Sequence, residues 1–217
     1  MYLTIENLLS DVNLNKIHKT VSECEDWQDG KQTAGLAAST VKINQQLPID
    51  CNSYTETIDI ISEELKQNLL FNAFTSAKKI HSLIVSKTIK GGKYGEHVDN
   101  AFINGKRTDL SFTIFLNNPD EYEGGLLSSE LFGGMKLKMG DAILYPSSTL
   151  HEVTEVTHGT RIVCCGWVES RIKDPAQRDL LFDLNAAKMA LLANEGKTEL
   201  FDLVCKSHNN LLRMWSS

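Results

Sequence analysis

Short strand-like segments separated by glycine-containing turns fill the chain between residues 78 and 172. The segment 110–116 (Leu-Ser-Phe-Thr-Ile-Phe-Leu) alternates apolar with small or polar residues, as expected of a half-buried strand. Turn residues follow at 117–120, 124–125 and 133–134. Many short strands at this spacing are typical of an antiparallel sandwich or barrel rather than a parallel βαβ sheet. The pattern therefore predicts an antiparallel β core.

Helical patterns flank this β region on both sides. Residues 11–24 and 55–71 carry apolar residues at helical spacing, and residues 39–44 between them alternate like a strand. After the β region, Asp174, Pro175 and Gln177 form a strong helix start, and two helical stripes follow. We expect a mainly β fold with flanking helices (α+β). Residues 1–77 would form an N-terminal helix and strand support region, 78–172 the β core, and 173–217 a C-terminal helical hairpin. The hairpin would either pack on the core or mediate a homodimer.

The composition is that of a soluble globular protein, with 41% hydrophobic and 23% charged residues. The net charge of −6 argues against a nucleic-acid partner bound mainly through phosphates. Five cysteines without a Cys-x-x-Cys pair predict a reduced, cytoplasmic protein, with the adjacent Cys164 and Cys165 as small core residues. No segment has the pattern of a signal peptide or the apolar length of a membrane span.

A His-x-Asp pair at His97 and Asp99, with a second histidine at His151, has the composition of a metal site. Residues i and i+2 of a strand project to the same face, so His97 and Asp99 can reach one ion together. Two imidazoles and one carboxylate are the facial triad of non-haem Fe(II) oxygenases, which leaves metal positions open. The alternative is that the pair occurs by chance and that each histidine is a surface or packing residue, as we expect of His18, His81, His158 and His208.

Arg161 lies ten residues after His151, at the start of an apolar strand. A hairpin at residues 157–160 would carry it back beside the metal. Because an unpaired buried guanidinium is costly, Arg161 needs an anionic partner. A dicarboxylate cosubstrate would supply one, with its keto-acid end on the metal and its far carboxylate on Arg161. A structural salt bridge to a distant acid is the alternative.

Several stretches around these residues match a known family. They are 27–35 (Trp-Gln-Asp-Gly-Lys-Gln-Thr-Ala-Gly), 41–46 (Val-Lys-Ile-Asn-Gln-Gln), 94–101 (Tyr-Gly-Glu-His-Val-Asp-Asn-Ala), 107–111 (Arg-Thr-Asp-Leu-Ser), 122–126 (Tyr-Glu-Gly-Gly-Leu), 144–148 (Leu-Tyr-Pro-Ser-Ser) and 159–161 (Gly-Thr-Arg). On these the chain resembles, over nearly its whole length, the PKHD-type hydroxylases. These are bacterial relatives of the prolyl 4-hydroxylase branch of Fe(II)/2-oxoglutarate dioxygenases. The resemblance implies a double-stranded β-helix (jelly roll) core.

The resemblance also implies roles for single residues. His97, Asp99 and His151 would bind Fe(II), Arg161 would bind the 2-oxoglutarate carboxylate, and no catalytic residue beyond the metal ligands is expected. O₂ would be the second cosubstrate and ascorbate the reductant. Phe115 stands where relatives outside this subfamily can offer a tyrosine hydroxyl to 2-oxoglutarate. A further donor would therefore come from the candidates Tyr94, Thr113 and Tyr145.

The leading hypothesis is thus an Fe(II)- and 2-oxoglutarate-dependent dioxygenase that hydroxylates an unidentified substrate and releases succinate and CO₂. The substrate would be a peptidyl prolyl or other protein residue, or a small molecule. One alternative is a non-catalytic, cupin-like sensor module that binds metal and 2-oxoglutarate. Another is a manganese or nickel enzyme of a different class on a related barrel.

Overall fold

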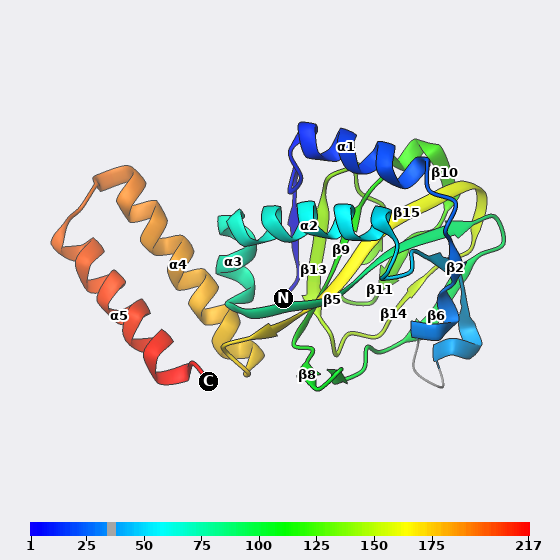
Figure 1. Ribbon diagram of the computed structural model, residues 1–217. Helices are drawn as coiled ribbons and strands as arrows, with labels where there is room; N and C mark the ends of the chain where they lie inside the picture. Colours follow the sequence, from blue (N-terminus) through cyan, green and yellow to red (C-terminus); the bar gives the residue numbers. More distant parts are fainter. Residues whose placement is uncertain (34–37) are drawn as a thin grey trace.

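Two antiparallel sheets face one another at the centre of the computed structural model, which describes residues 1–33 and 38–217 (Figure 1). The larger sheet has the order β1 (Leu3–Ile5), β13 (Ala142–Pro146), β9 (Leu110–Phe115), β15 (Val156–Ser170), β5 (Ala77–Ile89), β4 (Gln45–Gln46) and β2 (Gln28–Asp29), and β10 (Tyr122–Gly124) also pairs with β15. The smaller sheet has the order β12 (Gly133–Met135), β11 (Leu127–Ser129), β14 (His151–Val153), β6 (Lys93–His97) and β3 (Lys42–Ile43). A separate pair joins β7 (Phe102–Ile103) to β8 (Lys106–Arg107). The predicted antiparallel β core is confirmed.

The larger sheet has a different chemical character on each of its faces. On β9, the outward side chains Leu110 and Ile114 join the main hydrophobic core, whereas Ser111 and Thr113 face the smaller sheet and line a cavity. Every residue of β9 is buried, so the prediction of a half-buried strand is wrong. The small and polar side of this strand faces a cavity inside the protein rather than bulk solvent.

Two N-terminal helices, α1 (Asp11–Ser22) and α2 (Asn52–Gln67), lie over the outer face of the larger sheet (Figure 1). Helix α2 buries Ile61 and Leu65 completely in the core. Burial of one such side chain stabilises the fold by about 2 kcal/mol. The prediction of a single helix over 55–71 is wrong because Asn68 ends α2 and its side chain accepts a 2.8 Å hydrogen bond from the Phe71 N–H. A short helix, α3 (Leu69–Thr75), starts there and leaves Leu69 exposed.

The chain crosses from the smaller sheet to the larger one between β3 and β4. Residues Ala38–Val41 form a 3₁₀ helix, and only Lys42 and Ile43 of the predicted strand 39–44 pair with β6. The carbonyl of Asn44 accepts a 3.0 Å bond from the Gly30 N–H, and β4 then pairs with β5 in the other sheet. A continuous strand is excluded because the chain changes sheets within it. The crossing lies along one end of the cavity between the sheets.

The C-terminal hairpin consists of α4 (Pro175–Glu195) and α5 (Glu199–Trp215). The predicted start of α4 is confirmed, since the Asp174 carboxylate accepts bonds from the Ala176 and Gln177 N–H groups at 2.8 and 3.1 Å. Near its base the hairpin packs on α3 through an edge-to-face contact of Phe182 with Phe74 at 5.3 Å, and its far end projects away from the β core (Figure 1). Among the described residues, no helix is long and apolar enough to cross a lipid bilayer.

Candidate metal centre

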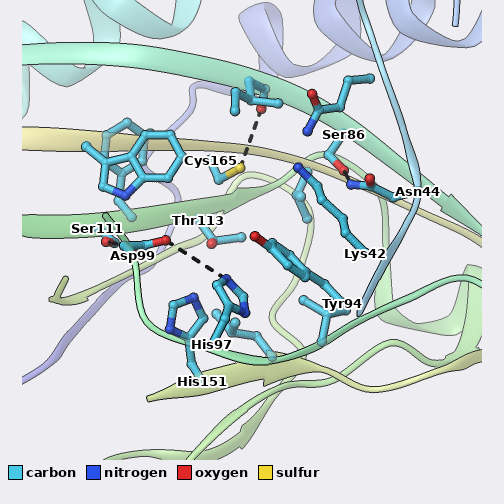
Figure 2. Close-up of a pocket in the computed structure, with 18 of the residues that line it drawn as sticks. Lys42, Asn44, Ser86, Tyr94, His97, Asp99, Ser111, Thr113, His151 and Cys165 are labelled. Atoms are coloured by element: carbon cyan, nitrogen blue, oxygen red, sulfur yellow. Dashed lines mark hydrogen bonds and ion pairs between the residues drawn. The ribbon is translucent and has the colours of Figure 1, made fainter. Parts of the chain in front are cut away.

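All of the residues predicted for the site line one cavity between the two sheets (Figure 2). They are His97, Asp99, His151, Arg161, Tyr94, Thr113 and Tyr145. The smaller sheet supplies the two histidines and Tyr94, and the larger sheet supplies Arg161, Thr113 and Tyr145. The other four histidines do not line this cavity.

His97, Asp99 and His151 converge at one end of the cavity. His97 is the last residue of β6 and lies directly opposite His151, the first residue of β14. Asp99 lies in the segment just after β6, and its Oδ1 is 4.0 Å from the His97 Nε2. One ligand atom from each residue lies within 4.8 Å of those from the other two. This spacing is suited to a single metal ion.

Hydrogen bonds orient all three of these side chains. His97 Nδ1 bonds to the Gly95 carbonyl and His151 Nδ1 to the Thr149 carbonyl, each at 2.8 Å. A carbonyl can only accept, so both Nδ1 atoms are donors and each Nε2 keeps a lone pair for a metal. On the other side of the site, the Ser111 hydroxyl donates a 2.5 Å bond to Asp99 Oδ2.

The buried environment keeps His97 neutral. Burial, and after it the neighbouring His151, lower the pKa of His97 to about 4. The Gly95 carbonyl and Asp99 oppose the shift. At pH 7 the ring is therefore an uncharged imidazole, which is the form that binds metals.

Arg161 faces the same cavity from β15 and is only 3% exposed. Its guanidinium carbon lies 5.6 Å from the centre of the Phe115 ring, and its Nε is buried without a hydrogen-bond partner. Burial lowers the pKa of Arg161, while Tyr122 and Cys165 oppose that shift. In the described part of the chain, no carboxylate forms an ion pair with Arg161. The site thus presents a buried cation with capacity for an anionic ligand.

The route that brings Arg161 to the cavity differs from the predicted one. Residues 157–160 are not a hairpin but belong to β15, which pairs with β10 through the Tyr122–Gly159 register. Residues 154–155 connect β14 in the smaller sheet to β15 in the larger sheet. Gly159 has φ +72°, and a Cβ there would lie 2.1 Å from the Glu121 carbonyl oxygen. This glycine marks close approach of two strands within the sheet, not a turn.

The three candidate donors occupy different positions around the cavity. Tyr94 stacks on His97, with ring centres 3.7 Å apart and planes 18° apart. The Tyr145 hydroxyl lies beside Thr113 on the larger sheet. Burial raises the pKa of both tyrosines, so each hydroxyl keeps its proton and can donate it in a hydrogen bond.

Comparison with known proteins identifies the family. The model of the 2OG-Fe(II) oxygenase superfamily matches residues 83–169. A PKHD-type hydroxylase of Acaryochloris marina is 46% identical over the full length of both chains. The chain belongs to the PKHD-type hydroxylases. A PKHD-type hydroxylase of Picosynechococcus is 44% identical, again over the full length of both chains. This family membership makes the protein a 2-oxoglutarate-dependent dioxygenase.

Solved structures confirm the predicted jelly-roll fold of this PKHD-type hydroxylase. A prolyl-4-hydroxylase of Pseudomonas putida has a TM-score of 0.52 at 18% identity, covering 78% of this chain and 92% of that one. The viral collagen prolyl hydroxylase of Paramecium bursaria Chlorella virus-1 has a TM-score of 0.51 at 18% identity, covering 78% and 96%. The carbocyclase SnoK has a TM-score of 0.57 at 12% identity, covering 79% and 80%. At these identities the similarity concerns the fold alone.

Several residues of the cavity wall are absent from the sequence-based prediction. Ser111 is one, although the polar side of its alternating strand was a usable signal. Cys165 faces the cavity, whereas its neighbour Cys164 packs in the core as predicted. Lys42 and Asn44 reach the cavity from the crossing between the sheets. They belong to the 41–46 stretch, which carried the family resemblance but no chemical assignment.

Proposed function

We propose that this PKHD-type hydroxylase binds Fe(II) through His97, Asp99 and His151, and binds the far carboxylate of 2-oxoglutarate through Arg161. The observation that carries the proposal is the buried Arg161 Nε, which has no partner and belongs to a side chain lining the same cavity as the triad. A guanidinium left in this state costs free energy. A bidentate carboxylate would offset that cost.

The donor set fits a ferrous ion. Two imidazole nitrogens and one carboxylate are the ligands that non-haem Fe(II) oxygenases use, and they leave several metal positions open. Carbonyl bonds to both Nδ1 atoms direct each Nε2 to the metal, and Ser111 holds the Asp99 carboxylate. These contacts fix the orientation of all three side chains, whose ligand atoms lie within 4.8 Å of one another.

With 2-oxoglutarate and O₂, bound Fe(II) would supply the oxidation that hydroxylates a C–H bond while the cosubstrate becomes succinate and CO₂. The residues of the chain would bind the metal, orient the cosubstrate and shield the site from water. Asp99 reduces the positive charge of the site, and Arg161 orients the cosubstrate by its far end. Tyr94, Thr113 and Tyr145 are the proposed further donors to it. Apolar wall residues such as Val163 and Leu127 limit the access of water.

The primary substrate and the reductant are further parts of the proposal. We propose a peptidyl prolyl or another protein side chain as the first class to test, and a small metabolite as the second. Ascorbate is the proposed reductant. The five cysteines are all free thiols, which fits the cytoplasmic location that we propose.

The experiment is an assay of succinate release from 2-oxoglutarate by the purified, Fe(II)-loaded protein in air. Wild type should release succinate even without added substrate, and His97→Ala and Asp99→Ala should abolish the release. His158→Ala is the matched control. His158 is exposed, its Nδ1 lies 3.2 Å from a carboxylate oxygen of Glu123, and it does not line the cavity. Turnover that survives both triad variants would overturn the ligand assignment. Binding of 2-oxoglutarate without any succinate from wild type would favour the sensor alternative.

We also propose that two copies associate through the α4–α5 hairpin. The hairpin exposes several large apolar side chains, namely Leu180, Met189, Leu192, Leu200, Leu203 and Met214. Exposed apolar surface of this kind favours association. Light scattering after size exclusion should give a dimer that Leu203→Glu converts to a monomer. A wild-type monomer at all concentrations would contradict this.

A further inference from the structure

Two cysteines and one aspartate meet beside the helices that cover the larger sheet. Cys24 and Asp26 follow α1, and Cys51 directly precedes α2. The two helices lie side by side and run in opposite directions, which brings the end of α1 next to the start of α2 (Figure 1). One donor atom from each of the three side chains lies within 4.8 Å of those from the other two. None of the three side chains lines the cavity of the proposed iron site.

Hydrogen bonds fix the backbone on the Cys24 side of this cluster. The Cys24 N–H donates to the Val21 carbonyl at 3.4 Å, and the Cys24 carbonyl accepts a 2.9 Å bond from the Trp27 indole. The Trp27 ring packs against the main hydrophobic core, and the Lys87 ammonium lies 4.2 Å from its centre. The segment that presents Cys24 and Asp26 is thus anchored to the body of the protein on both sides.

Cys51 is held by the first turn of α2. Its N–H donates to the Pro48 carbonyl, and its carbonyl accepts a bond from the Thr55 N–H, each at 3.2 Å. Its Sγ accepts a 3.3 Å bond from the Tyr54 N–H, as the side chain of an N-cap residue does. Burial raises the pKa of the Cys51 thiol and the Tyr54 N–H opposes that shift, so binding of a metal would release a proton. The sulfur is therefore fixed within reach of the other two donors.

The chemistry of the donors identifies the kind of ion. Two thiolates and one carboxylate suit Zn(II), whereas Mg(II) and Ca(II) prefer oxygen ligands. In a tetrahedral zinc site with bonds of about 2.0–2.3 Å, neighbouring donor atoms are about 3.5–3.8 Å apart. The separation of at most 4.8 Å therefore requires only small movements of the side chains. Because Asp26 is exposed and both cysteines are half-buried, solvent can supply the fourth ligand.

The local charge also favours a cation. Glu23, Glu25 and Asp50 flank the two cysteines in the sequence and are all exposed. Lys87 acts on Cys24 from β5. The same two thiols could form a disulfide, but a disulfide makes no use of a carboxylate, whereas the Asp26 carboxylate completes a set of three metal donors. The composition of the cluster therefore favours a metal ion.

We propose that Cys24, Asp26 and Cys51 form a second metal site, which binds one Zn(II) ion and is separate from the proposed iron site. A metal here joins the two ends of the segment 25–50. This segment contains β2, β3 and β4 and forms one end of the cavity wall. A metal that closes a long segment restricts its unfolding. Zn(II) at this site therefore stabilises one end of the cavity without contacting its ligands.

The test uses Co(II) as a spectroscopic substitute for Zn(II), bound to the reduced, full-length protein. Bonds from thiolate sulfur to Co(II) produce charge-transfer absorption in the near ultraviolet, whereas the nitrogen and oxygen donors of the proposed iron site do not. Cys24→Ser and Cys51→Ser each remove one sulfur, and serine at position 51 is itself a preferred N-cap for α2. Cys205→Ser is the matched control, because Cys205 is also half-buried but lies in α5.

A second pair of variants tests the carboxylate. Asp26→Asn keeps both thiols, and Glu25→Gln is its control because Glu25 is an exposed carboxylate of the same segment outside the cluster. These exposed substitutions keep the test informative if a cysteine variant does not fold. His97→Ala separates the new site from the iron site.

We expect the thiolate band in wild type and in the two control variants, and in His97→Ala it should saturate at one equivalent of Co(II). Cys24→Ser and Cys51→Ser should lack the band at the same Co(II) concentration. Asp26→Asn should bind Co(II) at least about tenfold more weakly, since even the loss of a group that only supports a metal ligand has an effect of this size. Hydrogen exchange should show that Zn(II) protects the N–H groups of β3 and β4 in wild type more than in Cys51→Ser.

Absence of the band from the reduced wild type, or an equal band in both cysteine variants, would overturn the metal site. A Cys24–Cys51 disulfide found by peptide mapping, with no band after its reduction, would overturn it in favour of a redox-active pair. Equal protection of β3 and β4 in wild type and Cys51→Ser would overturn the stabilisation of the cavity wall. The proposed function does not depend on any of these results, because the iron site has its own ligands.

Discussion

Replacing Ser111 with alanine tests whether the residues around the three proposed ligands, and not the ligands alone, prepare the metal site. The Ser111 hydroxyl donates a 2.5 Å hydrogen bond to Asp99 Oδ2 and also bonds to the Ser147 hydroxyl at 2.8 Å. A hydrogen bond to a charged group contributes about 1.5–3 kcal/mol. Loss of such support for a metal ligand weakens metal binding about 10- to 100-fold. We therefore expect Ser111→Ala to bind Fe(II) or Zn(II) about 10- to 100-fold more weakly.

The assay is competition of the protein with a chromogenic chelator under anaerobic conditions. Ser86→Ala is the control, because Ser86 lines the same cavity and is equally buried but bonds to Asn44 instead of Asp99. This control removes the same number of atoms from the same cavity. If Ser111→Ala and Ser86→Ala bind metal equally well, Asp99 does not depend on Ser111 and the reasoning is refuted.

Three further predictions concern Arg161, His97 and Gly159. Arg161→Lys keeps the charge but loses the bidentate fork, so the 2-oxoglutarate concentration for half-maximal succinate release should rise at least about tenfold; an unchanged concentration would indicate a structural arginine. The pKa of His97 is about 4 in the fold, and about 6.5 is usual for an unfolded chain. Between these pH values the unfolded chain therefore binds more protons than the folded one. The free energy of unfolding of the metal-free protein should fall by up to about 3 kcal/mol as the pH falls from 6.5 to 4. Urea denaturation gives the free energy of unfolding at each pH. Between pH 6.5 and 4 this free energy should fall more steeply for wild type than for His97→Asn, and parallel curves of the two proteins would contradict the prediction. Finally, Gly159→Ala places a Cβ 2.1 Å from the Glu121 carbonyl, whereas Gly133→Ala, also at positive φ (+70°), meets nothing within 4 Å. Gly159→Ala should lower the melting temperature clearly more than Gly133→Ala. In Gly133→Ala only the side chain at positive φ destabilises the fold, by about 1 kcal/mol. Equal losses of melting temperature would refute the predicted clash.

The β core and the triad are predictable from sequence because they depend on local patterns. Strand alternation and turn residues identify the sheets, and His-x-Asp with a later histidine carries its own chemistry. The wrong predictions concern residues whose position in the fold is set by contacts with segments distant in the sequence. Ser111 reads as the outer side of a half-buried strand, but the second sheet covers it. Residues 157–160 read as a turn because of Gly159, yet β10 pairs with them and makes them part of β15.

Lys42 could not be assigned to the cavity wall from sequence for a related reason. It lies in a strand of two residues, and the chain leaves that sheet directly after it. Neither alternation nor charge pattern in 41–46 indicates which side chains turn inward. Only the packing of the two sheets brings Lys42 over Tyr94, beside the metal centre. The N-terminal domain boundary at 77 stays a prediction, although β1, β3 and β4 extend the two sheets of the core.

The most direct test of the central claim is an anaerobic titration of the Fe(II)-loaded protein with 2-oxoglutarate, followed by visible absorption. Chelation of Fe(II) by a 2-oxo acid produces a charge-transfer band, so the measurement reports metal and cosubstrate at one site without turnover. We predict a band that saturates at one equivalent in wild type, needs more 2-oxoglutarate in Arg161→Lys, and is absent in His97→Ala. No band in wild type, or the same band in His97→Ala, would contradict the account.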